Sequence, residues 1–198
     1  MAEGGEASGF SDEELRRRKR KKLIRYIIAF VIFQTAVIAL FSMTVMKFRT
    51  PKFRIRSAGF ERFEINPSNP SFNFRLNAIV GVKNPNFGTY KFDPSTIVFY
   101  YRGVQVGNAA VPNSKANFRS TKNLNVAADL VTPDNVGNKE ILSTDLSYGI
   151  LPLTSEAVME GEVTIMFFKK KKSARMHCNM DVITQAGIAG MLQNINCE

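Results

Sequence analysis

The sequence predicts a mainly β protein: a single N-terminal transmembrane helix followed by an antiparallel β-sandwich with one short helix. Two observations carry this prediction. Residues 26–46 contain no charged side chain. After them, apolar residues alternate with polar ones at period two, as in strands with one buried face. We therefore divide the chain into a cytosolic basic tail (1–22), a transmembrane helix (23–46), a juxtamembrane linker (47–54) and a sandwich domain (55–198).

The tail begins with a Gly- and Ala-rich stretch, residues 1–10, which we expect to be disordered. Ser11 to Glu14 match a capping box, so a helix is predicted to start near Asp12. A dense basic run precedes the span: Arg16, Arg17, Arg18, Lys19, Arg20, Lys21 and Lys22. This run is interpreted as a topology signal, and it also suits attraction to anionic cytoplasmic lipids.

The apolar run 26–46 is 21 residues long, and at about 1.5 Å per residue it spans about 31 Å, close to the hydrocarbon core of a bilayer. A buried helix of a soluble domain is disfavoured because the run has no polar face. A cleaved signal peptide is disfavoured because the run exceeds the usual apolar length and leads directly to Lys47, Phe48 and Arg49. An uncleaved anchor is predicted.

Flanking charge sets the expected orientation. Eight Lys or Arg residues precede the span within 1–25, and five follow it within 47–56. The excess places the N-terminus in the cytosol and the sandwich on the other side of the membrane. Small residues lie at helical spacings: Ala29, Ala36, Ala39 and Ser42. They could pack two spans together into a homo-oligomer, but we favour their interpretation as ordinary helix surface that faces lipid.

Alternation predicts the strands of the domain. The first is expected within 51–59, and long one-sided strands follow over 72–83, 123–130, 159–167 and 175–182. The runs 95–101 and 104–110 flank Arg102-Gly103 and predict a hairpin. One helix is predicted at 138–147, after Thr132-Pro133-Asp134, which interrupts regular secondary structure. One-sided alternation over many strands favours an antiparallel sandwich over a parallel sheet.

Two features near the C-terminus invite functional interpretations. Lys169, Lys170, Lys171 and Lys172 are predicted to form a charged hairpin tip that either stays in water or contacts an anionic surface. Cys178 and Cys197 could form one disulfide, which would stabilise the fold by about 3 kcal/mol in the loop-entropy model, or remain free thiols in a reducing compartment.

The sequence gives no sign of catalysis. The chain has one histidine, His177, on the polar side of a predicted strand. Nucleophile elbow, metalloprotease, phosphate-loop and dinucleotide motifs are absent from the sequence. We therefore expect no enzyme activity, no cofactor and no metal. The net charge of +10 suits nucleic acid, anionic lipid or acidic polysaccharide, but the adjacent span argues against nucleic acid.

The order of these features resembles the group 2 late embryogenesis abundant proteins of plants, and more closely their membrane-anchored, harpin-induced-like branch. The resemblance rests on Asn84-Pro85-Asn86 after a long strand, on Phe99 to Gly103, on the strand ending at Leu130 and on the terminal cysteine pair. Pro85 and its two Asn neighbours also suit a shaped strand exit, so we interpret this motif as a structural turn.

The resemblance implies a fibronectin type III-like sandwich and a non-enzymatic role in stress or defence at the plasma membrane, with plasmodesmata or endomembranes as alternatives. The expected partners are the membrane and a receptor or wall-associated protein, with anionic lipid or acidic polysaccharide as further candidates. The alternative function is a tethering or lipid-binding module that uses the basic patches.

Overall fold

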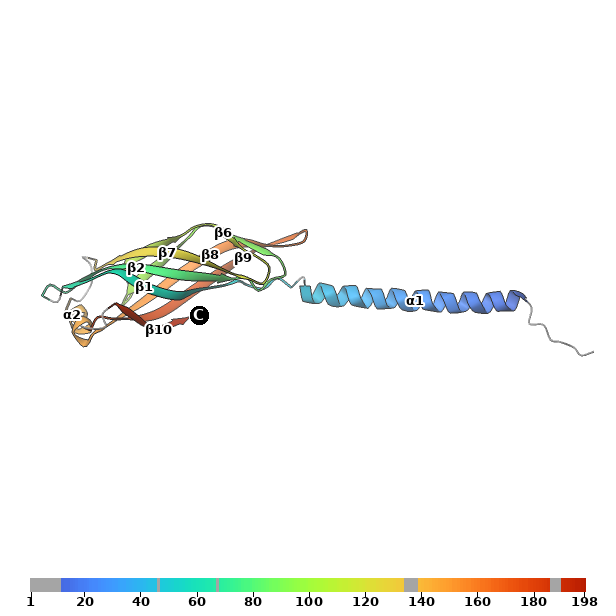
Figure 1. Cartoon of the computed structure of the whole chain (residues 1–198), viewed down its shortest axis with the longest axis horizontal. Coiled ribbons are helices and arrows are strands. Elements are labelled where there is room, and N and C mark those ends of the chain that lie inside the picture. The colour runs from blue at the N-terminus through green and yellow to red at the C-terminus, as the bar shows by residue number, and fades with distance from the viewer. Residues whose placement is uncertain (1–11, 46, 67, 134–138, 186–189) are drawn as a thin grey trace, which may run out of the picture. The chain divides into compact units, whose positions relative to one another are not determined.

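The computed structural model describes residues 12–45, 47–66, 68–133, 139–185 and 190–198. The chain forms two compact units, residues 1–47 and residues 48–198, and each is described by itself. The first contains the helix α1 (Asp12–Val45), and the second contains the strands and the helix α2 (Lys139–Tyr148) (Figure 1).

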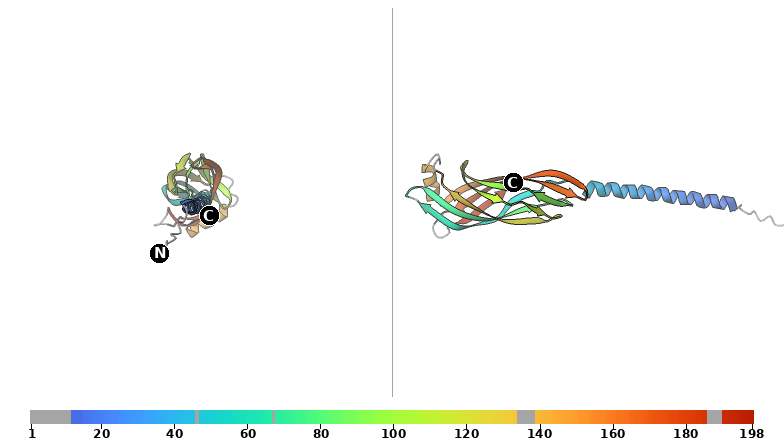
Figure 2. Two further views of the ribbon diagram at one scale, coloured as in Figure 1. Left: turned by 90° about the vertical axis from the view of Figure 1, so that its right-hand side faces the viewer. Right: turned by 90° about the horizontal axis from the view of Figure 1, so that it is seen from above.

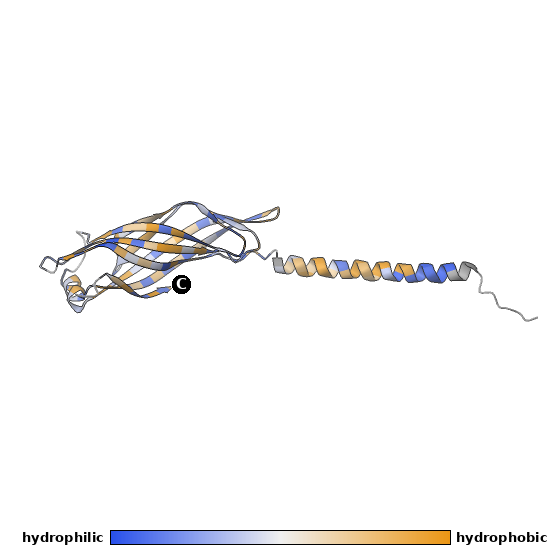
Figure 3. Cartoon of the chain, in the orientation of Figure 1, coloured by the Kyte–Doolittle hydropathy of each residue, from blue (hydrophilic) through white to orange (hydrophobic). Residues whose placement is uncertain are grey.

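Helix α1 is 34 residues long and carries its basic and apolar residues in separate blocks. Figure 3 shows a hydrophilic N-terminal part followed by a hydrophobic remainder. None of the side chains in its most apolar window is buried. The hydroxyls of Thr35 and Thr44 donate to the carbonyls of Val31 and Leu40, 2.8 and 2.9 Å away, so these polar groups are satisfied within the helix. The predicted start near Asp12 agrees with the helix, whereas the proposed cap Ser11 lies outside the described residues.

The second unit has ten strands that pair only in antiparallel fashion within the described ranges. Their bounds are β1 Lys52–Asn66, β2 Ser71–Lys83, β3 Thr89–Phe92, β4 Ser95–Tyr101, β5 Val104–Val111, β6 Ser114–Ala116, β7 Thr121–Val131, β8 Ile150–Ile165, β9 Phe168–Ile183 and β10 Met191–Cys197. The predicted mainly β sandwich with one further short helix is confirmed. The first strand begins at Lys52, inside the range 47–54 that was predicted to be a linker.

Pairing follows the order β1-β2-β7-β5-β4-β8-β3-β6, with β9 beside β8 and β10 beside β9. Along one side of the long strand β8, the first half pairs with β4 and the second half pairs with β3. The strands lie around a common core, as the two views of Figure 2 show. This core contains the inward residues of β2, Phe72, Phe74, Leu76, Ala78, Val80 and Val82, all buried as the alternation predicts.

Helix α2 covers one end of the strands and buries Leu142 completely. Its bounds agree with the predicted helix to within one residue, and Asn138 lies outside the described residues. The hairpin predicted around Arg102-Gly103 is also present. Both turn residues have positive φ, 45° and 83°, as a two-residue hairpin of type I′ requires.

One predicted element is wrong in detail. The four lysines 169–172 do not form the tip of the last long hairpin; they lie within β9, paired with Gly161 to Thr164 of β8. The tip is Met166-Phe167, because Ile165 pairs directly with Phe168. Alternation extends the predicted strand through Phe167 since this turn contains no Gly, Pro, Asn or Asp to mark it.

Candidate functional site

Strand directions bring four connecting segments to one end of the sandwich, which we call the proximal end. These are residues 48–51 before β1, 84–88 after β2, 117–120 after β6 and 166–167 between β8 and β9. The pairings Lys52 with Lys83, Lys83 with Thr121 and Thr89 with Thr164 place them together. The opposite, distal end carries α2 and the Arg102-Gly103 turn.

Asn84 organises the backbone of the proximal end from a fully buried position. Its amide Nδ2 donates to the carbonyls of Gly88, Ala116 and Asn117 at 2.7, 3.1 and 3.1 Å. Its Oδ1 accepts from the backbone N–H and the Nδ2 of Asn86, both at 3.0 Å. An uncharged side chain thereby satisfies five buried or partly buried groups of the neighbouring segments.

Asn86, also fully buried, holds the first residues of the domain. Its Oδ1 accepts the backbone N–H of Arg49, and its Nδ2 donates to the Arg49 carbonyl at 2.8 Å. This pair of bonds imitates the exchange between two paired strands. The segment that leads from α1 into the sandwich is therefore fixed to the turn after β2, and we call this contact the Asn86 clamp. The motif Asn84-Pro85-Asn86 lies in that turn, where the sequence predicts it.

Gly88 closes this turn against the neighbouring hairpin. A Cβ atom at Gly88 would lie 2.0 Å from the carbonyl oxygen of Thr164 in β8. A side chain larger than hydrogen cannot fit there without a shift of backbone. The proximal turn and the β8–β9 hairpin are consequently in direct main-chain contact.

The tip of that hairpin is apolar and exposed. Phe167 is 91% exposed, and its neighbours Met166 and Phe168 are exposed as well. Met166 has a φ of 51°, a left-handed conformation that Gly and Asn adopt more readily than Met. Phe118, in the turn after β6, is a further exposed aromatic at this end, 5.4 Å from the ring of Phe87.

Basic residues gather at the same end of the sandwich as the exposed tip. Segments 48–52, 83–88, 115–122 and 166–172 contain no Asp or Glu and carry the set that we call the basic collar: Arg49, Lys52, Lys83, Lys115, Arg119, Lys122, Lys169, Lys170, Lys171 and Lys172. Glu162 of β8 offsets part of this charge, because it lies 3.5 Å from the Nζ of Lys169 and opposite Lys171. The Nζ of Lys170 lies 6.0 Å from the ring centre of Phe48.

The distal end has the opposite balance. Segments 61–75, 100–103, 129–133, 139–151 and 180–185 carry the acids Glu61, Glu64, Asp129, Glu140, Asp145 and Asp181 against the bases Arg62, Arg75, Arg102 and Lys139. The sandwich is therefore electrically polarised along its strands, with the positive charge at the proximal end.

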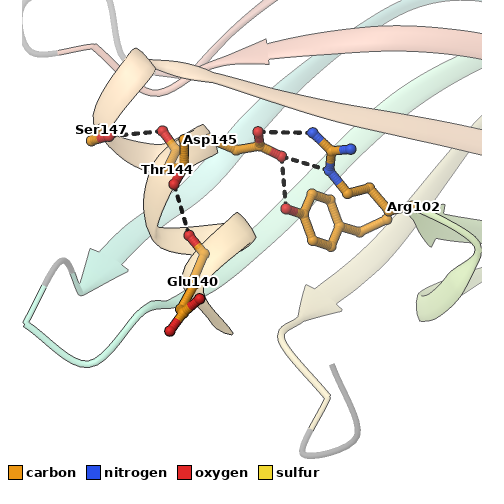
Figure 4. Close-up of polar contacts among 6 residues, drawn as sticks. Arg102, Glu140, Thr144, Asp145 and Ser147 are labelled. Carbon is orange, nitrogen blue, oxygen red and sulfur yellow. Dashed lines mark hydrogen bonds and ion pairs between the residues drawn. The ribbon is translucent and has the colours of Figure 1, made fainter. Parts of the chain in front are cut away.

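A hydrogen-bonded cluster fastens α2 to the distal hairpin (Figure 4). The Nε and Nη2 of Arg102 donate to the two carboxylate oxygens of Asp145, both at 2.9 Å, and the hydroxyl of Tyr101 donates to Asp145 Oδ2 at 2.7 Å. On α2 itself, Thr144 and Ser147 bond to the carbonyls of Glu140 and Thr144, which ties up their hydroxyls. Sequence reasoning misses this cluster, because nothing in the sequence links residues 43 positions apart.

The cluster shifts the acidity of its members. Partial burial acts to raise the pKa of Asp145, but the hydrogen bonds from Arg102 and Tyr101 outweigh it and hold that pKa below its ordinary value. Burial, together with the bond to Asp145, raises the pKa of Tyr101 to about 12. Because both shifts follow from attachment of α2 to the hairpin, they mark a structural contact and not a reacting group.

The two cysteines are joined in the structure. Cys178 of β9 and Cys197 of β10 form a disulfide with an S–S distance of 2.02 Å. They are directly opposite in register, and the neighbouring residues His177 and Glu198 exchange both backbone hydrogen bonds. The bond therefore sits at a non-hydrogen-bonded pair, where Cα atoms approach most closely, here 4.1 Å.

The described residues offer no catalytic arrangement. His177 is exposed, and its Nδ1 lies 3.2 Å from a carboxylate oxygen of Glu156, which is likewise exposed. No group of three or more His, Cys, Asp or Glu among these residues could hold a metal ion. A surface cleft of about 470 Å³ beside β3 is lined by side chains of both signs, including Lys91, Glu160 and Lys172.

No family model matches the chain. The curated Late embryogenesis abundant protein At1g64065 of Arabidopsis thaliana is 27% identical over 207 aligned residues, which cover 98% of this chain and 94% of that protein.

Two solved structures show weaker likeness. The solution structure of AT1g01470 from Arabidopsis thaliana has a TM-score of 0.43 at 11% identity and covers 72% of this chain and 88% of its own. A putative late embryogenesis abundant protein, At2g46140.1, has a TM-score of 0.34 at 11% identity and covers 95% and 98%. Over nearly its whole length, the chain is thus similar in sequence to a curated late embryogenesis abundant protein.

Proposed function

We propose that this chain is a single-pass membrane protein that holds a non-enzymatic β-sandwich at a membrane surface during the plant stress response. The observation that carries the proposal is α1: within Arg16–Thr44 it is long and apolar enough to cross a bilayer, and none of its most apolar window is buried. The family relative supports the stress-related role. Membership of the harpin-induced-like branch, with a part in defence, is a finer proposal that rests on the motif resemblance.

The proposed topology places the N-terminus in the cytosol and the sandwich outside the cell, at the plasma membrane. Two features support it. Basic residues are denser before the span than after it. The Cys178–Cys197 disulfide suits an oxidising compartment and would be unusual in the cytosol. In this position the sandwich is free to meet a receptor or a wall-associated partner.

Topology is the first measurement to make. Short epitope tags are added at both ends of the full chain, and sealed microsomes are treated with protease before and after detergent. We expect the C-terminal tag to be protected until detergent is added, and the N-terminal tag to be removed at once. Thiol labelling on the same membranes is expected to find Cys178 and Cys197 unreactive before reduction.

A matched pair of variants makes the test sharper. Replacing Arg16, Arg17, Arg18 and Lys19 by Gln weakens the topology signal, whereas replacing four bases of the collar, Lys169 to Lys172, leaves the flanks of the span unchanged. Only the first variant is expected to produce a population of inverted chains. A C-terminal tag that is digested in sealed microsomes of the unaltered protein would overturn the proposed topology.

The absence of catalysis is likewise a proposal. The exposed His177–Glu156 pair has the geometry of a surface ion pair, which contributes little to stability and needs no functional explanation.

A further inference from the structure

The β8–β9 turn breaks the ordinary rule for its position. Two-residue hairpin turns favour Asn, Asp and Gly, which accept positive φ and remain hydrated. Here the two positions are Met166, at a φ of 51°, and Phe167, with nearly its whole side chain in solvent. The distal hairpin of the same domain uses Arg102-Gly103, which has a polar first residue and the favoured glycine at its second position. An exposed, strained apolar tip is costly to a soluble surface, and such outliers cluster at functional sites.

The tip lies at the same end of the sandwich as the basic collar. Phe168 follows it in the chain, and Lys169 to Lys172 come next, while Phe118 and Arg119 lie at the same end. Exposed aromatic side chains next to a run of lysines are suited to the headgroup region of a bilayer. There, apolar rings reach the acyl boundary and cations meet lipid phosphates and carboxylates.

Chain length keeps this end of the sandwich near any membrane that α1 crosses. Val45 ends the helix and Phe48 begins the domain, so three Cα–Cα steps separate them, at most about 11 Å for steps of about 3.8 Å. The Asn86 clamp then fixes Arg49 to the proximal turn, and the Phe48 ring lies 6.0 Å from the Nζ of Lys170. These limits hold for every orientation that the two units adopt.

We propose that the proximal end is a membrane-docking surface. In this arrangement Phe167 inserts into the interface of an anionic bilayer, and the basic collar binds the lipid headgroups. The inference rests on the proposed anchoring but not on the proposed orientation, because the leaflet that faces the sandwich must carry the anionic headgroups. It goes beyond anchoring, because it assigns a lipid surface as the ligand and Phe167 as the residue that enters it. The uneven charge of the domain favours docking through the proximal end, because anionic headgroups repel the acidic distal end.

The chain contains no tryptophan, so one introduced indole becomes the only such reporter. The full chain carrying Phe167→Trp is reconstituted in vesicles of phosphatidylcholine alone, or of three parts phosphatidylcholine to one part phosphatidylserine. Docking predicts a blue-shifted emission, and strong quenching by brominated acyl chains, in the vesicles that contain phosphatidylserine. The control is Tyr148→Trp, an aromatic site on α2 at the distal end that is 80% exposed, which is expected to stay unquenched and red-emitting.

Charge is tested in the Phe167→Trp background. Changing Lys169, Lys170 and Lys171 to Gln is expected to lower the docked fraction, by roughly fivefold per residue in the docking equilibrium. The matched control changes Arg62, Lys139 and Arg175, three exposed bases outside the collar, and is expected to have little effect. Raising the salt from about 0.1 M to about 1 M shortens the Debye length from about 10 to about 3 Å and should release the tip.

Flotation of the vesicles after an alkaline wash reports anchoring independently of docking. If the protein floats but the Phe167→Trp indole emits and is quenched like that of Tyr148→Trp in both lipids, docking is overturned and anchoring stands. If the protein does not float, the proposed function itself fails. Salt-sensitive binding of soluble polygalacturonate by the collar, with no lipid quenching of the Phe167→Trp indole, would also overturn docking on lipid.

Discussion

At the scale of single residues, two buried amides hold together the connecting segments at the proximal end of the sandwich. Asn84 and Asn86 are two positions apart and share one side-chain hydrogen bond, yet their other bonds reach Arg49, Gly88 and Ala116. The residue types alone predict a structural turn at Asn84-Pro85-Asn86, since Asn and Pro favour such turns. They do not indicate the partner carbonyls, because these come from segments that only the fold brings together.

Asp145 provides a pH-dependent contact at the distal end. Its pKa is depressed in the folded protein, so its contribution to stability is complete above its unfolded pKa, near 3.8, and is lost as the pH falls through the folded value. We expect Asp145→Asn to cost about 1 kcal/mol at neutral pH, as for loss of a charged hydrogen-bonding partner. The loss should shrink as the pH falls below about 4, because the carboxyl of the unfolded chain is protonated first and the native one follows at its lower pKa.

Urea unfolding monitored by circular dichroism at several pH values would measure this difference. Asp129→Asn is the matched control, because Asp129 also binds an arginine, Arg75, but on an exposed face of β7. An exposed pair contributes little, so the control should follow the unaltered protein at every pH. A difference for Asp145→Asn that stays constant from neutral pH to about pH 2, below the ordinary carboxyl range, would contradict the assigned role.

At the scale of elements, periodicity was a reliable guide where a strand has one long buried face. The alternation in β2 and in the C-terminal half of β9 is reproduced residue by residue in their burial. The short strands β3 and β6 have four and three residues, too few for a period to be recognised. Strand β10 lies beside β9, and the spacing of its apolar residues is irregular because the register shifts between Gln193 and Asn196.

The Met166-Phe167 turn carries a prediction for the stability of the domain. Replacing Met166-Phe167 by Gly-Ser puts glycine at the position with positive φ, which relieves the backbone strain there. After allowance for the greater freedom of glycine in the unfolded chain, we expect a gain of about 0.5–1 kcal/mol. Urea unfolding would measure it.

Phe167→Ser alone is the matched control, because it leaves Met166 and its conformation unchanged. It should give no comparable gain. If both variants are equally stable, or if Gly-Ser is the weaker, then the left-handed turn does not store the strain that we assign to it. A stabilised variant that no longer docks would show that the apolar tip is retained at a cost in stability.

At the scale of the whole molecule, the sandwich begins earlier than the predicted linker 47–54 allowed. The linker was expected at 47–54, yet Arg49 is clamped by Asn86 and Phe53 is buried in the core. The error has a physical source: five basic residues in 47–56 look like a solvated linker, although Phe53 and Ile55 alternate with them and face inward.

Two fragments test where the domain begins. Residues 48–198 are expected to fold without α1, because the internal contacts of the sandwich are all retained. Residues 55–198 lack the clamp and the buried ring of Phe53, and loss of one large core side chain typically costs about 3–5 kcal/mol. Thermal unfolding under non-reducing conditions should give a clearly lower Tm for the shorter fragment. Equal Tm values would restore the linker boundary at residue 54.

The Cys178–Cys197 disulfide has a consequence for how the sandwich would respond to a reductant. It joins β10 to β9 at directly opposite positions, whereas β9 is held to β8 by a ladder of sixteen paired residues. Cleavage of the S–S bond would therefore remove the covalent link of β10 alone and leave the β8–β9 ladder in place. A change in redox state would be felt first along the β10 side of β9, and the rest of the sheet would keep its pairing.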